Sequence, residues 1–280
     1  MNGNSLFRAV ALGAGLLWAA APAFGEGGAN TSAQAAYVIW PDGVAVTDSI
    51  PPTTGISDEG TPQWFRFGSG ARRSYSVEIF QLRENGINSP AQATLTAAFN
   101  DLAGTVPVAF TDLSFADPGG GDYNPPALRR YVVRDVPVAG RVMLRIASSL
   151  NFQTSATQTF QLRVIDTTLI GTRVSTLGYD TFVALHNSAD YQVSASIHFY
   201  DESGAFVGTQ VRAINGRGSV QLRYAQDDPT YGGRRGAVEV THNGSPGSVV
   251  GHTYWYNPTT TQFGPQMELK ASRSWGRGSF

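Results

Sequence analysis

Cysteine is absent from all 280 residues of the chain. Its absence excludes disulfides, thiolate metal ligands, a cysteine nucleophile and the acylated cysteine of a lipoprotein. Charge is also scarce, because Asp, Glu, Lys and Arg make up 15% of the residues and 20 basic side chains face 21 acidic ones. A chain this evenly balanced offers no basic surface for phosphates, so we expect no nucleic acid among its partners.

Lysine is nearly absent as well, since Lys270 is its single occurrence. The arginines include three doublets, Arg72-Arg73, Arg129-Arg130 and Arg234-Arg235. Flanking Gly, Ala and Pro residues predict that these doublets lie in solvated loops or at strand edges.

Long apolar runs are missing apart from one stretch near the start, Ala9–Phe24, which follows a single Arg8. That stretch is shorter than the ~20 residues that span a bilayer. Small residues precede two positions suited to cleavage, before Phe24 and before Glu26. We therefore predict a cleaved signal peptide over residues 1–25, export to the periplasm, cell surface or medium, and no membrane span in the mature chain.

Helical periodicity is missing from the rest of the chain, where alternation with a period of two dominates. It is clearest at residues 75–79, 142–146 and 160–164. Asn, Asp and Gly turn signals separate these short segments, and the chain holds 32 Gly and 15 Pro. The pattern predicts an all-β fold of sandwich type. Residues 89–104 also fit a helix, but their alternation favours a strand.

The run of strands breaks near Thr167 and Thr168, where one strand closes and a new series opens. We predict two tandem β-sandwich domains over residues 26–167 and 168–270, followed by a tail over 271–280. Without cross-links, a chain of this length is still large enough to bury a stable core. The lead-in 26–40 is expected to add a short strand to its own sheet, with pairing to a neighbouring molecule as the alternative.

The first predicted domain carries the pattern "PQWFRFGSGARRSYSVEIF", followed later by "YVVRDVPVAGRVMLRIAS" and "TFQLRVI". Over residues 44–167 this order resembles the pre-peptidase C-terminal domain family. That resemblance implies a jelly-roll-like β-sandwich of the kind appended to secreted bacterial enzymes and surface proteins. The acidic positions that bind calcium in some members do not map onto this sequence.

The second predicted domain carries "DTFVALHNSADYQVSASIHFYDESGAFVG", then "SVQLRY" and "GAVEVTHNGSPGSVVGHTYWYN". Over residues 180–257 this resembles an immunoglobulin-like module common in bacterial exported proteins. The resemblance implies that Phe182, Ala184, Val193, Ala195 and Ile197 pack the sheets and that His186-Asn187 ends a strand. It implies roles in spacing, adhesion or assembly and no general catalytic activity.

Residues 185–204 gather the ingredients of a hydrolase or a metal site. The polar residues concerned are His186, Ser188, Asp190, His198, Asp201 and Glu202. Neighbouring strand residues that share a face stand about 7 Å apart, so the first three cannot form a triad among themselves, and no G-x-S-x-G elbow occurs. Alternation from Tyr191 to Phe199 instead places His198 on the solvent side of a half-buried strand.

Four histidines occur in the chain, His186, His198, His242 and His252. None has an H-x-x-x-H or H-E-x-x-H spacing. Convergence of His186 with His242 stays open, and His198 with Asp201 or Glu202 would supply two ligands at most. We predict a solvated polar face and no metal site.

Two further segments invite a ligand. The Gly-rich loop with Asp117, Asp122 and Asn124 could hold calcium, although these residues also form ordinary turns. Near the C-terminus, the stretch from Tyr254 to Phe263 includes Trp255 and could stack on sugar rings. Strand alternation puts Trp255 on the side opposite its neighbours, which favours a core position for at least one side.

The sequence therefore predicts no catalytic residues, no cofactor and no enzyme. It favours a secreted structural or adhesion protein of the bacterial surface that acts through sheet faces and edges. The expected partners are a protein or a polysaccharide at the cell surface, or further copies joined through strand edges. The alternative is a carbohydrate-binding accessory protein of a secreted system.

Overall fold

The computed structural model describes residues 30–51, 61–81, 93–114, 128–148, 157–227 and 229–272. These residues form an all-β protein, as the alternation predicts. The strands before Thr167 are β1 (Tyr37–Val38), β2 (Val46–Ile50), β3 (Gln63–Ser69), β4 (Tyr75–Gln81), β5 (Ala93–Phe99), β6 (Phe110–Asp112), β7 (Leu128–Val133), β8 (Gly140–Ser148) and β9 (Gln158–Asp166).

The elements after Thr168 are again strands, with one short helix and one 3-10 turn. They are β10 (Leu169–Ser175), β11 (Asp180–Asn187), β12 (Val193–Asp201), β13 (Phe206–Ile214), β14 (Ser219–Arg223), α1 (Tyr224–Asp227), η1 (Pro229–Tyr231), β15 (Arg235–His242), β16 (Val249–Asn257), β17 (Gln262–Phe263), β18 (Met267–Glu268) and β19 (Lys270–Ala271). No helix among the described residues is long and apolar enough to cross a membrane.

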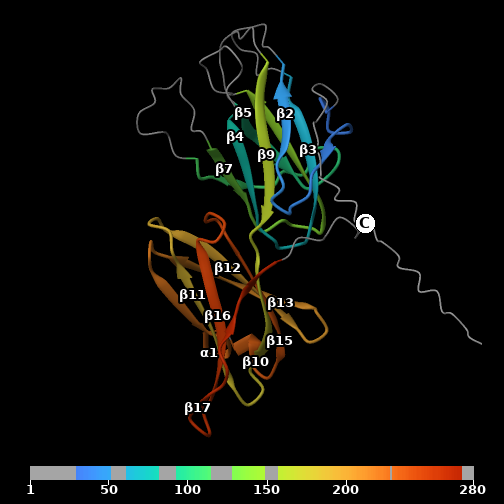
Figure 1. Cartoon of the computed structure of the whole chain (residues 1–280). Helices are drawn as coiled ribbons and strands as arrows, with labels where there is room; N and C mark the ends of the chain where they lie inside the picture. The colour runs from blue at the N-terminus through green and yellow to red at the C-terminus, as the bar shows by residue number, and fades with distance from the viewer. Residues whose placement is uncertain are drawn as a thin grey trace, which may run out of the picture.

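The strands build four sheets, and each sheet stays on one side of Thr167-Thr168. Before that point, sheet I has the order β1-β3-β8-β5 and sheet II the order β2-β9-β4-β7-β6. After it, sheet III has the order β13-β12-β15-β10-β19, and sheet IV the order β14-β11-β16-β17 with β18 also on β16. Figure 1 shows the two halves as two lobes, with β9 running to their border and β10 continuing in the second lobe.

Each half has its own hydrophobic cluster. The first cluster joins sheets I and II through buried residues such as Phe65, Leu144 and Phe160. The second joins sheets III and IV through residues such as Phe199 and Val183. Strict alternation of burial in β9 shows the physical basis of the sequence pattern, because alternate side chains of a strand point to opposite faces.

Two local predictions are confirmed in the first half. Residues 93–99 form strand β5 and not a helix, and they pair with β8. The lead-in residues Tyr37–Val38 form β1, which pairs in parallel with β3 of the same molecule. The lead-in thus adds to its own sheet.

The central strand β4 is buried on both faces. Ser76 and Glu78 are buried along with Val77 and Ile79. Glu78 is tolerated there because Arg130 from β7 and Arg163 from β9 reach its carboxylate, with N–O distances of 2.7 and 2.5 Å. Buried charges require such partners.

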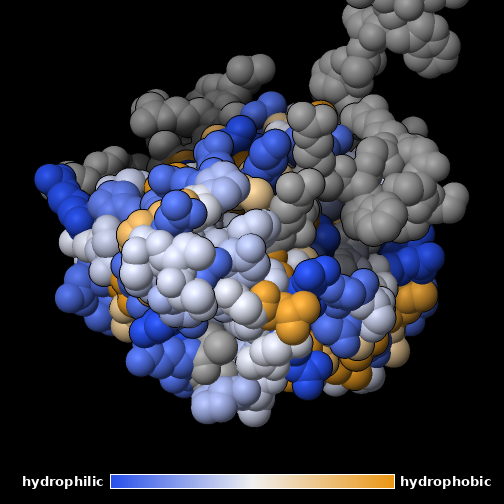
Figure 2. Space-filling model, turned by 90° about the horizontal axis from the view of Figure 1, so that it is seen from below, coloured by the Kyte–Doolittle hydropathy of each residue, from blue (hydrophilic) through white to orange (hydrophobic). Residues whose placement is uncertain are grey.

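The outer surface of the second half is mostly hydrophilic. Seen from its end in Figure 2, apolar residues form small separate patches among polar ones. The large apolar side chains most exposed in this half are Phe263, Val211, Leu177 and Val250. The predicted signal peptide, residues 1–25, and the loop 117–124 lie outside the described residues.

Candidate functional site

The structure corrects the prediction for the strand that carries His198. Ser196 and His198 point outward from sheet III, as the alternation requires, but they are not solvated, with exposures of 2% and 3%. The turn after β7 covers them, because Asp135 of the first half inserts its carboxylate over this face. These outward-facing positions of β12 therefore form part of the interface between the two halves.

Asp135 is the centre of a compact hydrogen-bond network. It accepts from Thr241 Oγ1 at 2.7 Å, from His198 Nε2 at 3.2 Å and from Ser196 Oγ at 3.2 Å. Burial acts to raise the pKa of Asp135, but the hydrogen bonds from His198 and Thr241 and the nearby charge of Arg134 outweigh it, so the net pKa lies below the usual value.

The order of groups around His198 is hydroxyl, imidazole, carboxylate, as in a hydrolase triad. Its Nδ1 lies 2.8 Å from Oγ1 of Thr209, an exposed residue on the edge strand β13, and its Nε2 faces Asp135. The setting differs from a triad, however. Thr209 lies within a regular strand paired with β12 and not on a strained elbow, and the imidazole is sealed beneath the first half. The arrangement fits an interface contact better than a reaction centre.

A second group of buried contacts joins the halves around Arg73. Its guanidinium lies 3.0 Å from Asp166 and 3.3 Å from Glu239 of β15, and it also bonds Ser272. The Ser74 amide donates to Thr168 Oγ1 at 3.1 Å. The prediction of solvated arginine doublets is therefore wrong for Arg73, whose side chain is 15% exposed. Arg130, in the second doublet, is also partly buried, and its guanidinium pairs with Glu78.

Of the other candidate residues in the stretch 185–204, Asp201 is half-buried and four face solvent, namely His186, Ser188, Asp190 and Glu202. His186 is exposed at the end of β11, and its Nδ1 lies 3.0 Å from Ser219 Oγ. Ser188 and Asp190 are exposed in the turn that follows. His242 is buried in β15 of the other sheet, so the structure does not bring it together with His186. Within the described ranges no three His, Cys, Asp or Glu side chains gather as for a metal ion.

The aromatic residues of β16 separate as their alternation predicts. Tyr254 stacks on Phe182 of β11, with ring centroids 4.9 Å apart, and both Tyr254 and Tyr256 contact Phe263. Trp255 points the other way and meets Tyr179, at a centroid distance of 5.8 Å. None of the three β16 residues is fully buried, so the expectation of a core position does not hold.

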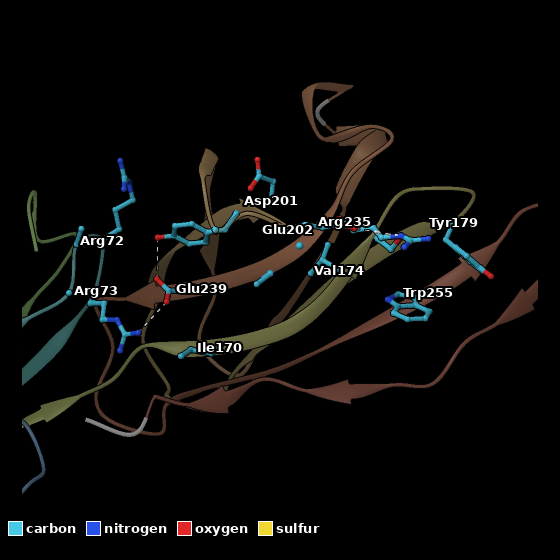
Figure 3. Close-up of a pocket in the computed structure, with 17 residues that line it drawn as sticks. Arg72, Arg73, Ile170, Val174, Tyr179, Asp201, Glu202, Arg235, Glu239 and Trp255 are labelled. Carbon is cyan, nitrogen blue, oxygen red and sulfur yellow. Dashed lines mark hydrogen bonds and ion pairs between the residues drawn. The ribbon is translucent and has the colours of Figure 1, made fainter. Parts of the chain in front are cut away.

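Beside the interface lies a cavity of about 980 Å³ that both halves line. Residues 70–73 of the first half form one end, where Figure 3 shows Arg72 and Arg73. Tyr179 and Trp255 lie at the opposite end. A concave space of this size at a boundary between two units is where proteins commonly bind small ligands.

The cavity combines an apolar floor with charged walls. Ile170 and Val174 of β10 lie along it, and Glu239 stands between its two ends (Figure 3). Glu239 binds Arg73 with one carboxylate oxygen and accepts from the Tyr200 hydroxyl at 3.2 Å with the other. Burial and the charge of Glu239 raise the pKa of Tyr200 to about 12, so this hydroxyl stays protonated at neutral pH.

Sequence reasoning missed this cavity. Its basic end derives from residues 70–73 and its floor from β10, about a hundred positions later. The doublet Arg72-Arg73 in a Gly-rich turn was the available signal, but its pattern did not show which strand it would meet. The chain matches no family model and no curated protein.

Proposed function

We propose that the chain is an exported, non-enzymatic adhesion or structural protein of the bacterial surface. In this proposal residues 1–25 are a cleaved signal peptide, residues 26–167 a jelly-roll-like β-sandwich, and residues 168–270 an immunoglobulin-like one. The resemblances to the pre-peptidase C-terminal family and to exported immunoglobulin-like modules support the two assignments. Separate hydrophobic clusters in the two halves agree with them.

The observation that carries the proposal is the polar lock between the halves. Asp135 and Arg73 of the first half insert charged groups into the face of sheet III. Charged groups that are hydrogen-bonded across an interface favour one relative arrangement of two units. A protein whose two halves are held in one arrangement presents its loops and cavity at fixed positions. This property suits recognition of a surface at several points.

Export is tested by expressing the whole chain in a bacterial host and sequencing the N-terminus of the product outside the cytoplasm. We expect a mature chain that starts at Phe24 or Glu26. Retention of Met1 in a cytoplasmic product would contradict the export part of the proposal.

The proposal that the protein is not an enzyme is tested at His198. The purified mature chain is incubated with isolated cell envelopes, and both the retained protein and any released soluble fragments are measured. We expect retention without time-dependent release. Fragment release that stops in a His198→Gln variant would overturn the proposal and assign the Thr209, His198 and Asp135 set to hydrolysis.

A second candidate function is carbohydrate binding, and the aromatic end of the cavity favours it. Trp255 and Tyr179 border polar side chains there, and an aromatic ring covers the apolar C–H face of a sugar. Affinity electrophoresis on a panel of polysaccharides tests it. Trp255→Ala should abolish retardation, whereas Phe263→Ala, which removes an exposed ring outside the cavity lining, should leave it unchanged.

A further inference from the structure

We propose that the cavity between the halves binds a carboxylated oligosaccharide, with Arg72 as the carboxylate-binding residue and Trp255 as the stacking residue. This inference rests on the carbohydrate-binding function proposed above and names its ligand class. It is independent of whether the protein is adhesive or structural at the surface.

Most charged groups that line the cavity are already engaged. Arg73 is shared by Asp166 and Glu239, and the second oxygen of Glu239 takes the Tyr200 hydroxyl. The Asp201 carboxylate accepts from the backbone and hydroxyl of Ser203 within its own turn. Arg73 is therefore already matched in charge, and Glu239 and Asp201 are themselves anions that do not bind a carboxylate.

Arg72 is the exception. No carboxylate of the described residues lies within 4.0 Å of its guanidinium, which instead sits over the ring of Phe206 at 3.6 Å and beside the Tyr200 hydroxyl. In Figure 3 it points away from both Arg73 and Glu239. The cavity therefore presents one cation whose charge no carboxylate of the described residues matches. A planar guanidinium binds a carboxylate through two parallel hydrogen bonds.

The backbone holds Arg72 in place at a cost. Its φ is +55°, which a non-glycine residue rarely adopts, and its amide donates to the Val136 carbonyl at 2.8 Å. Left-handed conformations of non-glycine residues are strained and cluster at binding sites. Stacking on Phe206 further restricts the side chain, so the guanidinium is oriented before a ligand arrives.

The opposite end of the cavity indicates a sugar. Trp255 and Tyr179 offer aromatic surface there. Between the two ends, Arg235 and Glu202 form a loose pair at 3.9 Å with side chains 60% and 68% exposed. Such groups can hydrogen-bond hydroxyls without breaking a tight ion pair. A ligand with a carboxylate, several hydroxyls and an apolar ring face matches this order of groups, and an acidic oligosaccharide has all three.

The test compares an oligogalacturonate with its fully methyl-esterified counterpart, which has the same rings without the charge. Titration calorimetry on the mature chain should give at least about tenfold tighter binding of the acid, because a charged hydrogen-bonded pair is worth roughly that factor. Added salt should reduce this preference.

Variants separate the two ends of the site. Arg72→Gln should remove the preference for the acid and keep the weaker binding of the ester, and Phe206→Leu should reduce the preference by removing the stacking ring. Trp255→Ala should weaken both ligands. Arg217→Gln is the matched control, because Arg217 also has a positive φ of 56° but lies outside the cavity lining. Thermal melts confirm that each variant is folded.

Equal affinity for acid and ester, or an unchanged preference in Arg72→Gln, would overturn the role of Arg72 and leave carbohydrate binding standing. Failure of both ligands to bind, with envelope retention intact, would overturn the saccharide site and leave the adhesion proposal standing. If the unaltered protein is not retained on cell envelopes, the adhesion proposal is overturned and the saccharide site is unaffected.

Discussion

Burial changes what a polar side chain does in this protein. His186 and His198 lie on the outward faces of their sheets, yet His186 is solvated and His198 is sealed beneath Asp135. The difference comes from a turn of the first half, which no pattern around either histidine encodes. At the scale of the residue, alternation predicts the direction of a side chain but not what covers it.

His242 provides a prediction of pH dependence. Burial lowers its pKa to about 4, against partial opposition from a hydrogen bond with the Thr167 backbone. The unfolded chain, with a histidine pKa near 6.5, therefore binds more protons between these values. The stabilising contribution of the neutral ring is present above pH ~6.5 and is lost as the pH falls towards 4. By pH ~4.5 we expect this loss to lower the free energy of unfolding by about 2–3 kcal/mol.

The measurement is urea unfolding at pH 7 and at pH 4.5 for the unaltered protein and for His242→Gln. The variant should lose less free energy of unfolding between the two pH values, since glutamine does not titrate. Equal losses in both proteins would show that His242 is not responsible for the acid sensitivity.

Asp135 gives a second prediction at the same scale. Replacing it by Ala removes the carboxylate that Thr241, Ser196 and His198 share, leaves only Thr241 Oγ1 near His198 Nε2, and puts Ala at a φ of 54°. We expect a loss of about 2–3 kcal/mol in the free energy of unfolding. Asp135→Asn keeps one acceptor oxygen and tolerates the left-handed backbone, so it should cost less, about 1 kcal/mol. Chemical denaturation compares the two, and equal costs would contradict the network.

At the scale of the element, the sequence predicts strands better than it predicts their surroundings. Alternation in β9 matches its burial, and β5 is a strand despite its helix-like spacing. In β4 the pattern gives the strand but not the burial of Glu78, because the two arginines that cover it come from β7 and β9. Cross-strand partners depend on register, and register is a long-range property.

The Glu78 pairing leads to a prediction about three strands. Glu78→Ala removes the carboxylate that binds Arg130 and Arg163 and leaves two partly buried guanidinium groups without it. We expect destabilisation by about 2–4 kcal/mol, near the range for breaking a buried ion pair. The matched control is Glu202→Ala, since its exposed pair with Arg235 at 3.9 Å should contribute less than about 1 kcal/mol. Similar losses in both variants, measured by urea unfolding, would contradict this account.

Strand pairing also depends on one glycine beside the cavity. A Cβ at Gly236 would lie 1.8 Å from the carbonyl oxygen of Tyr200, on the neighbouring strand β12. Gly236→Ala must therefore push β12 and β15 apart where they line the cavity. We expect a loss of about 1–3 kcal/mol, the usual range for overpacking. An unchanged denaturation midpoint would show that β12 and β15 accommodate the extra methyl group without loss of stability.

For the whole molecule, composition and turn signals predict an all-β chain, whereas the cavity depends on how the two halves meet. Residues 70–73 and β10 are far apart in sequence, and the contacts that unite them run through single side chains such as Arg73 and Asp135. A pattern read within a window of ten or twenty residues contains no information about such contacts. The candidate site is therefore visible only in three dimensions.

The interface also predicts how the molecule unfolds. Arg73 is bound at once to Asp166 of the first half and to Glu239 and Ser272 of the second, so it couples the two halves energetically. We expect the unaltered protein to unfold in one calorimetric transition. Arg73→Ala leaves buried carboxylates without their cation and should divide the transition into two, with the lower one shifted downward. Arg217→Ala, at an exposed turn, should retain a single transition. A single unshifted transition in Arg73→Ala would mean that the halves are coupled by contacts other than this lock.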